Sequence, residues 1–588
     1  MNICFFAKKD EKFTKKTNYI ADLFFSTYGL DYQTIHSLEQ LGEADFPKPD
    51  LIVFYGNRED FQTLREKSPP PCHLLFVAQL FHQAFEPIPP EVKRLKQKGT
   101  DYSLPILFAY PVPEQECAYV VEEKSGKRYP GITIEKSEGR MEIACYADIF
   151  ASSFYWLTLQ EEKGKERFFA WGSRREREGL HQIPLVNHSF KLLFGLIQLV
   201  AREEEMPLLF KSFWPSGSKL AVALTHDVDI LAQWILYTIF RKWKLLKKGN
   251  FKAWIKLLSK FPGFILKKNK SLYGVNLILD EEKNQGVDST FFFMAGEPNL
   301  KTILKSDITY SIQKAEPVIK KILSARGEIG LHGSRNSYLK KETLIAEKEK
   351  LDRFLTHPSI GTRQHFLYLT PPQTWRFQSE SGFLYDCTLG YPDRSGFRSG
   401  FGFPFQPYDP VADEKIGIWE INTNVMDQTY DKYDPKEIDE IKKEIEELVT
   451  QLENAGGGLL TLLWHTNVLD EFGFPGFMKL YGELLKTFLK EKAFVSSGEN
   501  IVKFWKARNE VKLLERKVEN NLWQWSYKAL SFISDLTFRM EIFPEHKSRL
   551  KIDGASASIK WDLQGAWITF PKLDQNQSFQ INLIREKV

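Results

Sequence analysis

Two carboxylates stand at the end of a short apolar run in the 588-residue chain. Residues 219–229 read KLAVALTHDVD, so a strand-like segment at 220–225 is followed by His226, Asp227 and Asp229. Burying an ionised carboxylate is costly unless it is paired or bound to a metal ion. A buried strand that delivers carboxylates at its carboxyl end is how α/β barrels place catalytic groups. We therefore expect other parts of the chain to supply partners for Asp227 and Asp229.

Further polar side chains recur at or near the ends of predicted strands. They are His332, Arg363, His365, Asp386, Glu420, Asp427 and His465. One histidine in such a position is more often a satisfied core residue, but four of the eleven histidines lie at these strand ends. Imidazole and carboxylate groups are common zinc ligands and also common general acids and bases. The set therefore favours a metal-dependent hydrolase over a structural explanation.

The same residues resemble, in order, the motifs of the NodB-type polysaccharide deacetylases (carbohydrate esterase family four). THDVD at 225–229 resembles the TFDDG motif, STFF at 289–292 the STFF strand, HGSRNS at 332–337 the H(S/T)xxH motif, RQHF at 363–366 the RxPY motif, YDCTL at 385–389 the YDSTL segment, and LWH at 463–465 the LxH motif. Each motif alone is weak, but the ordered set is fairly specific. The longer pattern is similar to the branch that carries an added N-terminal domain.

The resemblance implies a distorted (β/α)7 barrel that removes N-acetyl groups from a glycan with one divalent metal ion, most simply zinc. It places Asp227 on the general base, His465 on the general acid and Arg363 on the arginine that orients the base. Amide hydrolysis needs an activated water, a stabilised oxyanion and a protonated leaving amine. A metal ion supplies the first two, and a carboxylate and an imidazole divide the proton transfers.

The metal ligands that the resemblance implies are Asp229, His332 and His365, with two departures from the family pattern. The family's metal aspartate directly follows the base, where this chain has Val228. A shift of one residue in an extended segment turns a side chain to the other face, so the role of Asp229 depends on how the chain bends. Asn336 stands at the second metal histidine and is a poorer zinc ligand, so His365 could replace it. The altered site could also favour a harder ion, or have lost its metal.

Three further residues are candidates for substrate binding. Arg398, in the GFRSG segment at 396–400, could bind a substrate anion, although a structural ion pair would explain it equally well. Asp386 lies in the YDCTL segment. Asp427 follows a predicted strand and could also orient His465.

Strand and helix patterns alternate through the part of the chain that carries these residues, which predicts an α/β barrel at residues 211–511. Ahead of it we expect a small α/β domain at residues 1–115 and a β-rich and helical connecting region at 116–210. Short alternating segments after it predict a β-rich appendage at residues 512–588.

Composition narrows the cellular setting. A net charge of +4 over 588 residues does not favour nucleic-acid binding. The five cysteines form no CxxC pair, which favours a reducing compartment. We see no signal peptide and no apolar run long enough to span a membrane, so we expect a cytoplasmic protein.

Residues 230–279 contain no acidic residue and interleave lysines with aromatic and aliphatic side chains. The pattern predicts two basic amphipathic helices, either packed on the barrel or in peripheral contact with an anionic inner-membrane surface. A deacetylase of a polysaccharide or of its lipid-linked precursor is the favoured function. The alternative is a non-catalytic, deacetylase-like protein that binds glycan or acts as a scaffold.

Overall fold

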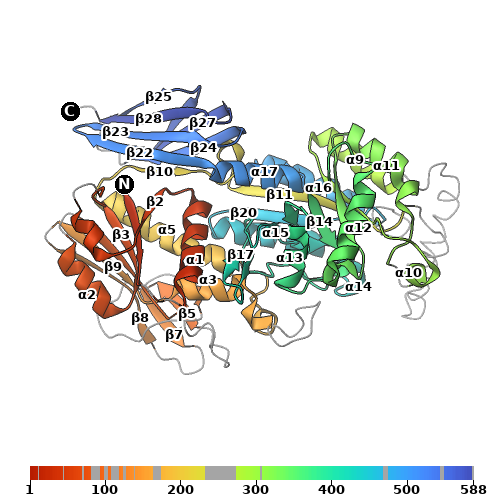
Figure 1. The fold of residues 1–588 in the computed structure, drawn as a ribbon, viewed down its shortest axis with the longest axis horizontal. Coiled ribbons are helices and arrows are strands. Elements are labelled where there is room, and N and C mark those ends of the chain that lie inside the picture. The colour runs from red at the N-terminus through yellow and green to blue at the C-terminus, as the bar shows by residue number, and fades with distance from the viewer. Residues whose placement is uncertain are drawn as a thin grey trace.

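The computed structural model describes residues 1–585 except for residues 9, 11, 44–45, 69–71, 81–92, 98–102, 107–117, 123–127, 138, 163–173, 232–272, 305–306, 468–473 and 543–547. Most of the predicted basic stretch at 230–279 therefore lies outside the described residues. Among those described, no helix combines the length and the apolar character needed to cross a membrane. The chain forms three bodies, namely an N-terminal sheet with its helices, a central barrel and a C-terminal β-sandwich (Figure 1).

The N-terminal body is built on one nine-stranded sheet with the order β2-β1-β3-β4-β9-β8-β7-β5-β6. Its strands are β1 Ile3–Ala7, β2 Tyr32–Ile35, β3 Leu51–Gly56, β4 His73–Ala78, β5 Lys93–Gln97, β6 Ser103–Ile106, β7 Ala118–Glu122, β8 Arg128–Ser137 and β9 Arg140–Cys145. Strand β4 pairs in parallel with β9, so the sheet continues across residue 115 and takes strands from both sides of that predicted boundary. The helices of this body are α1 Thr14–Tyr28, α2 Arg58–Lys67, α3 Ile149–Leu157, α4 Arg174–Arg177 and α5 Leu185–Glu203.

The central body contains a parallel sheet with the order β18-β15-β14-β13-β12-β11-β20-β19, and β21 pairs with β11 beside it. The strands are β11 Leu220–Val228, β12 Thr290–Phe293, β13 Glu328–Gly333, β14 Gly361–Gln364, β15 Tyr385–Asp386, β18 Trp419–Glu420, β19 Val425–Met426, β20 Gly458–Leu463 and β21 Phe494–Ser496. The two edge strands, β18 and β19, are joined by only four residues, which requires the sheet to curl. The predicted α/β barrel-like fold is thus confirmed.

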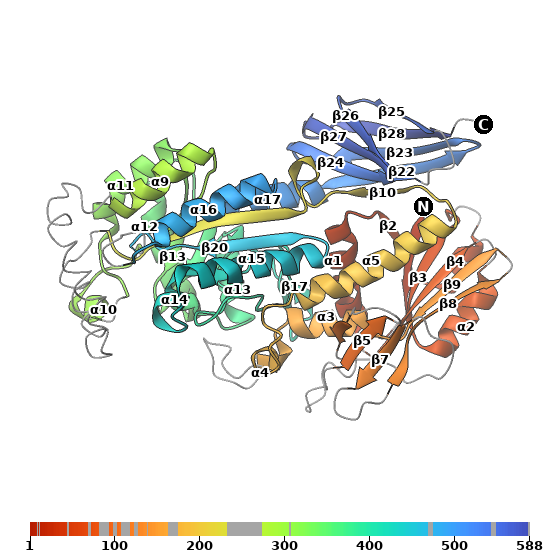
Figure 2. The same cartoon turned by 180° about the vertical axis from the view of Figure 1, so that it is seen from behind.

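The strands β11, β12 and β20 are largely apolar on both faces, as is usual for parallel strands that helices cover. The helices of this body are α9 Tyr273–Gln285, α10 Leu300–Leu304, α11 Ile312–Ser324, α12 Lys341–Asp352, α13 Gln373–Glu380, α14 Asp427–Lys432, α15 Ile438–Asn454, α16 Phe477–Lys490 and α17 Gly498–Asn509. Figure 2 shows α15, α16 and α17 running alongside the long strands β11 and β20. All the described strands of the barrel sheet point the same way, so their carboxyl ends share one end of the barrel.

The C-terminal body is a sandwich of two four-stranded antiparallel sheets, which confirms the predicted β-rich appendage. Its strands are β22 Val511–Glu519, β23 Leu522–Ala529, β24 Ile533–Glu541, β25 Ser548–Asp553, β26 Ser558–Asp562, β27 Gly565–Leu573 and β28 Ser578–Arg585. One sheet gains its edge strand, β10 Leu208–Lys211, from the segment that precedes the barrel. The sandwich is therefore completed by residues from far earlier in the chain.

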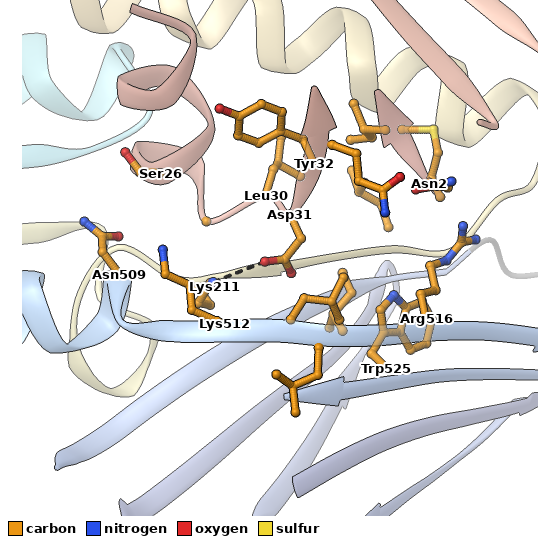
Figure 3. A pocket seen from close by; sticks show the side chains of 18 of the residues that line it. Asn2, Ser26, Leu30, Asp31, Tyr32, Lys211, Asn509, Lys512, Arg516 and Trp525 are labelled. Atoms are coloured by element: carbon orange, nitrogen blue, oxygen red, sulfur yellow. Dashed lines mark hydrogen bonds and ion pairs between the residues drawn. The ribbon is translucent and has the colours of Figure 1, made fainter. Parts of the chain in front are cut away.

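A cavity of about 1410 Å³ lies between the N-terminal sheet and the sandwich. Figure 3 shows Asp31 pointing toward Lys211 from the N-terminal side, with Trp525 and Arg516 on the sandwich side. The Asp31 carboxylate lies 3.5 Å from Lys211 Nζ and also accepts a hydrogen bond of 2.6 Å from the Tyr527 hydroxyl. These contacts tie the two bodies together across the cavity.

Arg508, near the end of α17, joins all three bodies at one point. Its side chain is fully buried and donates hydrogen bonds to four backbone carbonyl oxygens. The acceptors are Ser26 (2.7 Å), Thr27 (3.0 Å), Lys211 (2.9 Å) and Ser212 (2.5 Å). The end of α1, the strand β10 of the sandwich and the last barrel helix are thereby held in one arrangement.

Replacing Gly29 by Ala should weaken this junction. Gly29 has φ +63°, and an added Cβ would lie 2.5 Å from the Lys211 carbonyl oxygen. Left-handed backbone and overpacking together predict a loss of about 2–4 kcal/mol in the free energy of unfolding. Gly286→Ala is the matched control, because its φ is +71° with no atom of the described residues within 4 Å of the new Cβ. Calorimetry that finds equal destabilisation in both variants would contradict the prediction.

Candidate active site

The structure brings the polar strand ends together at the carboxyl end of the barrel sheet. Asp227 lies near the end of β11 and Asp229 directly after it, while His332 lies near the end of β13. His365 directly follows β14, and His465 follows β20 by two residues. Neighbouring parallel strands place these positions side by side, since the register pairs His332 with Arg363 and Thr225 with Leu463.

Asp229, His332 and His365 form a cluster that could hold a metal ion. His332 Nε2 lies 3.3 Å from Asp229 Oδ1 and 2.9 Å from His365 Nδ1, and His365 Nδ1 lies 3.5 Å from the same carboxylate oxygen. Ligands held at about 2.0–2.1 Å from a tetrahedral ion are about 3.3 Å apart. Asp229 Oδ1 is buried and makes no hydrogen bond within the described residues. The spacing and this unsatisfied oxygen both fit a divalent ion.

The orientation of His332 is set by its other ring nitrogen. His332 Nδ1 lies 3.0 Å from the backbone carbonyl oxygen of Arg363. Because a carbonyl oxygen only accepts, the Nδ1 atom carries the proton, which leaves the Nε2 lone pair directed at the cluster. This arrangement is typical of metal-ligating histidines.

Asp229 reaches the cluster because it is two residues from Asp227. Strand β11 continues through Val228, and residues two apart on a strand lie on the same face. Val228 points to the opposite face and is buried among apolar side chains. The Tyr310 hydroxyl donates to the Val228 carbonyl (2.7 Å) and the Thr309 hydroxyl to the Asp229 carbonyl (2.5 Å), which fixes the chain here. The residue shift in the motif therefore keeps both carboxylates on one side.

Asn336, which the sequence resemblance places at the position of the second metal histidine, is exposed and is not part of the cluster. His365 occupies the cluster instead, on a different strand. His365 Nδ1 lies 2.9 Å from His332 Nε2, so the geometry is compatible with the prediction that His365 replaces the missing histidine.

Asp227 is paired with a buried arginine. Arg363 Nη1 donates to Asp227 Oδ1 (2.9 Å), while Nη2 donates to the hydroxyls of Thr225 (2.8 Å) and Thr423 (3.2 Å). Burial favours a higher pKa for Asp227, but His332, Arg363 and His465 outweigh burial and lower the pKa below its usual value. Asp227 is therefore an anion at neutral pH, and its second oxygen lies 3.5 Å from His332 Nε2.

His465 lies near both Asp227 and Asp229, and Asp427 holds its imidazole in place. Asp427 accepts hydrogen bonds from His465 Nδ1 (2.7 Å) and from the His465 backbone nitrogen (2.6 Å). His465 Nε2 lies 3.6 Å from Asp229 Oδ2 and 3.9 Å from Asp227 Oδ2. Burial favours a lower pKa for His465, but Asp427, Asp229 and Asp227 outweigh it and raise the pKa above its usual value.

Asp427→Asn should restrict hydrolysis to lower pH if His465 acts as an acid. The negative charge of Asp427 raises the pKa of His465, so its removal lowers that pKa, and the protonated imidazole disappears at a lower pH. We expect the alkaline limb of the kcat/KM profile to move down by about one pH unit, in line with the loss of one close charge. A pH–rate profile measures this directly, and an unmoved alkaline limb would contradict it.

Two predicted substrate-binding residues have partners elsewhere. The Arg398 guanidinium is fully buried and donates to both Glu162 carboxylate oxygens (2.9 and 3.2 Å) and to the Gly390 carbonyl (3.0 Å). Asp386 is fully buried beside Glu420, and burial raises the pKa of Asp386 to about 6. These placements give both residues structural roles, and their binding of substrate stays a prediction that the placements do not support.

His226 lies next to Asp227 but faces away from the cluster. Its Nδ1 lies 2.8 Å from the Trp464 carbonyl oxygen and its Nε2 lies 3.0 Å from Glu282 Oε1. Glu282 also accepts a hydrogen bond of 2.7 Å from the Tyr481 hydroxyl. The strand alternation that unites Asp227 with Asp229 thus sends His226 into the packing between β11 and its covering helices.

Sequence reasoning missed the residues that position the charged groups. The hydroxyls of Thr423 and Thr225 both accept hydrogen bonds from Arg363 Nη2, and the Tyr310 hydroxyl donates a hydrogen bond to the Val228 carbonyl oxygen. Thr225 was visible as the first residue of the THDVD motif. Thr423 and Tyr310 carry no local signal, because their roles depend on elements distant in sequence.

Comparisons with known proteins leave the function open. Residues 7–201 match a family of unknown function (DUF7033). No curated protein matches the chain. Its function must therefore be inferred from the site itself.

Solved structures that resemble the chain include three carbohydrate-related proteins. A presumed polysaccharide deacetylase from Mycobacterium smegmatis is 21% identical over 52% of this chain and 96% of its own, with a TM-score of 0.33. Agd3, a carbohydrate deacetylase, is 9% identical over 100% of this chain and 99% of its own, with a TM-score of 0.38. A CE4 family pseudoenzyme from Bacillus anthracis is 12% identical over 49% of this chain and 66% of its own, with a TM-score of 0.26.

Proposed function

We propose that this protein hydrolyses N-acetyl groups of a polysaccharide or of its lipid-linked precursor with the help of one divalent ion, zinc being the first choice. One observation carries the proposal. The cluster of Asp229, His332 and His365 lies within 4 Å of both an arginine-paired carboxylate, Asp227, and an aspartate-held imidazole, His465. A metal ligand set, a base and an acid thus meet in one place.

The three groups divide the work of breaking an amide bond. When bound, a divalent ion would supply Lewis-acid polarisation of the amide carbonyl and acidify the attacking water. Asp227 takes a proton from that water while the water oxygen adds to the carbonyl carbon of the amide. Arg363 keeps Asp227 anionic and oriented. His465 gives its Nε2 proton to the amide nitrogen as the C–N bond breaks, which releases acetate and a free amine.

The electrostatics support these directions of proton transfer. Asp227 has a lowered pKa and begins as an anion, whereas His465 has a raised pKa and begins protonated more often than an ordinary histidine. An anion accepts a proton and an imidazolium donates one. The opposite shifts of the two groups support the base and acid roles that the resemblance implies.

Acetate release from N-acetylated oligosaccharides by the zinc-loaded protein tests the proposal. We expect release to depend on metal, to stop after treatment with a chelator and to return when metal is added back. If the protein binds a divalent ion but releases no acetate from any N-acetylated glycan, the alternative function of glycan binding or scaffolding would take its place.

Cytoplasmic location and membrane contact through residues 230–279 stay predictions, since residues 232–272 fall outside the described part of the chain. Flotation with vesicles tests the membrane contact. Binding that does not depend on anionic lipid would contradict it.

A further inference from the structure

At the edge of the candidate site lies Arg335, whose side chain has no carboxylate partner among the described residues. Arg335 belongs to the loop after His332, and its backbone nitrogen donates to Asp307 Oδ1 (3.0 Å). The preceding residue, Ser334, donates its backbone nitrogen to the buried carboxylate of Glu347 (3.0 Å). The loop that carries Arg335 is therefore held firmly at its backbone.

The Arg335 side chain rests on two aromatic rings beside the metal cluster. Its guanidinium carbon lies 5.7 Å from the centre of the Phe366 ring and 5.5 Å from the centre of the Tyr368 ring. The Phe366 ring in turn packs on the imidazole of His365, with ring centres 3.9 Å apart. A single aromatic ring thus separates the cation from a predicted metal ligand.

The backbone under these rings is strained. Phe366 and Leu367 have φ values of +62° and +55°, which side chains with a Cβ rarely adopt. Two such residues in succession cost free energy and persist where the surrounding structure fixes them, most often at functional sites. Here the conformation lays Phe366 between His365 and Arg335.

The guanidinium of Arg335 differs from those of the two fully buried barrel arginines, Arg363 and Arg398. Arg363 pairs with Asp227 and Arg398 with Glu162, whereas within the described residues Arg335 makes no ion pair and its guanidinium makes no hydrogen bond. Its side chain is only half-buried. The aromatic faces stabilise the cation and fix its position, while its five N–H groups stay available to an anion.

We propose that Arg335 binds an anionic oxygen group, a phosphate or a carboxylate, on the substrate beside its N-acetyl sugar. This inference rests on the proposed function and narrows it to acidic glycans or phosphate-linked precursors. A guanidinium on a rigid aromatic support suits such groups because its planar fork matches two oxygens at once. Arg335 is a binding residue in this account and takes no part in the proton transfers.

Three N-acetylated substrates separate the sources of the charge: neutral triacetylchitotriose, N-acetylglucosamine 1-phosphate, and an oligosaccharide with the carboxylate of N-acetylmuramic acid. We expect the zinc-loaded protein to prefer at least one anionic substrate over the neutral one. Arg335→Ala should then lower kcat/KM for that substrate by about 10- to 100-fold, chiefly through KM, with the neutral substrate within about twofold. Arg335→Lys should keep part of the preference, because it keeps the charge but loses the planar fork.

Arg326→Ala is the matched control, since Arg326 is exposed and pairs with Asp288 away from the site. Metal content must stay unchanged in all variants. If Arg335→Ala lowers kcat/KM equally for neutral and anionic substrates, or for neither, Arg335 does not bind the anion.

Loss of the proposed function would be recognised separately, by the absence of acetate release from every substrate. In that case calorimetric binding of the same three compounds to the zinc-loaded protein decides the inference. Tighter binding of an anionic compound that Arg335→Ala abolishes supports it, and equal binding of all three compounds, or unchanged binding in the variant, overturns it.

Discussion

Asp227→Asn is expected to lower kcat by about 10²- to 10⁴-fold, the usual contribution of a positioned acid or base. The amide cannot take the proton of the attacking water, but its oxygen can still accept the hydrogen bond that Arg363 Nη1 donates to Asp227 Oδ1. The fold of the site should therefore persist while the reaction slows. KM should change little, because in the proposed mechanism Asp227 would act mainly in the transition state.

Steady-state acetate release measures the loss, and metal analysis and calorimetry show whether the variant still binds metal and folds. Glu282→Gln is the matched control, since Glu282 is another buried carboxylate beside β11 but faces His226 on the opposite side. We expect that variant to keep its activity within a few-fold. An Asp227→Asn protein that binds metal and retains wild-type kcat would exclude Asp227 as the base.

His332→Ala should remove the metal ion. Loss of an outer-shell partner typically lowers metal affinity by about 10- to 100-fold, and loss of a ligand itself should exceed that. Of the three candidate ligand atoms, His332 Nε2 lies closest to the other two. Without it, only Asp229 and His365 of the cluster remain to bind the ion. Hydrolysis should fall with the metal content.

Metal analysis after dialysis against a weak chelator measures this effect without depending on any substrate. His226→Gln is the matched control, because His226 precedes Asp227 directly but contacts Glu282 and the Trp464 carbonyl. It should keep the metal. Equal metal content in the His332→Ala protein and the wild type would show that the ion, if any, is bound elsewhere.

The order of the short motifs was enough to predict which side chains meet, because strand ends on one parallel sheet necessarily share an edge. Asp227, Arg363, His332 and His465 all lie where that reasoning expects them. The orientation of the Asp229 side chain was harder to predict, because the family pattern has its metal aspartate where this chain has Val228. On a strand the relevant comparison is with Asp227 itself, two residues away.

Roles that depend on distant partners could not be predicted. Arg398 sits in a motif that looked able to bind substrate, yet its partner Glu162 lies 236 residues earlier in the chain. The same holds for β10, whose four residues belong to a sandwich that begins some 300 residues later. Local patterns give strands and helices, but pairing over such separations is set by the packing of the whole chain.

The hydrogen bonds of Arg508 bear on whether the barrel can be separated from the other two bodies, by evolution or by a protein engineer. A barrel cut out at residues 211–511 would keep this cation but lose the carbonyls of Ser26 and Thr27 that solvate it. The sandwich would lose β10 at the same time. An excised barrel would leave the buried Arg508 guanidinium short of two acceptors, so we expect it to be less stable alone than within the whole chain. Transplanting the barrel would keep these contacts only if the N-terminal body and the sandwich were moved with it.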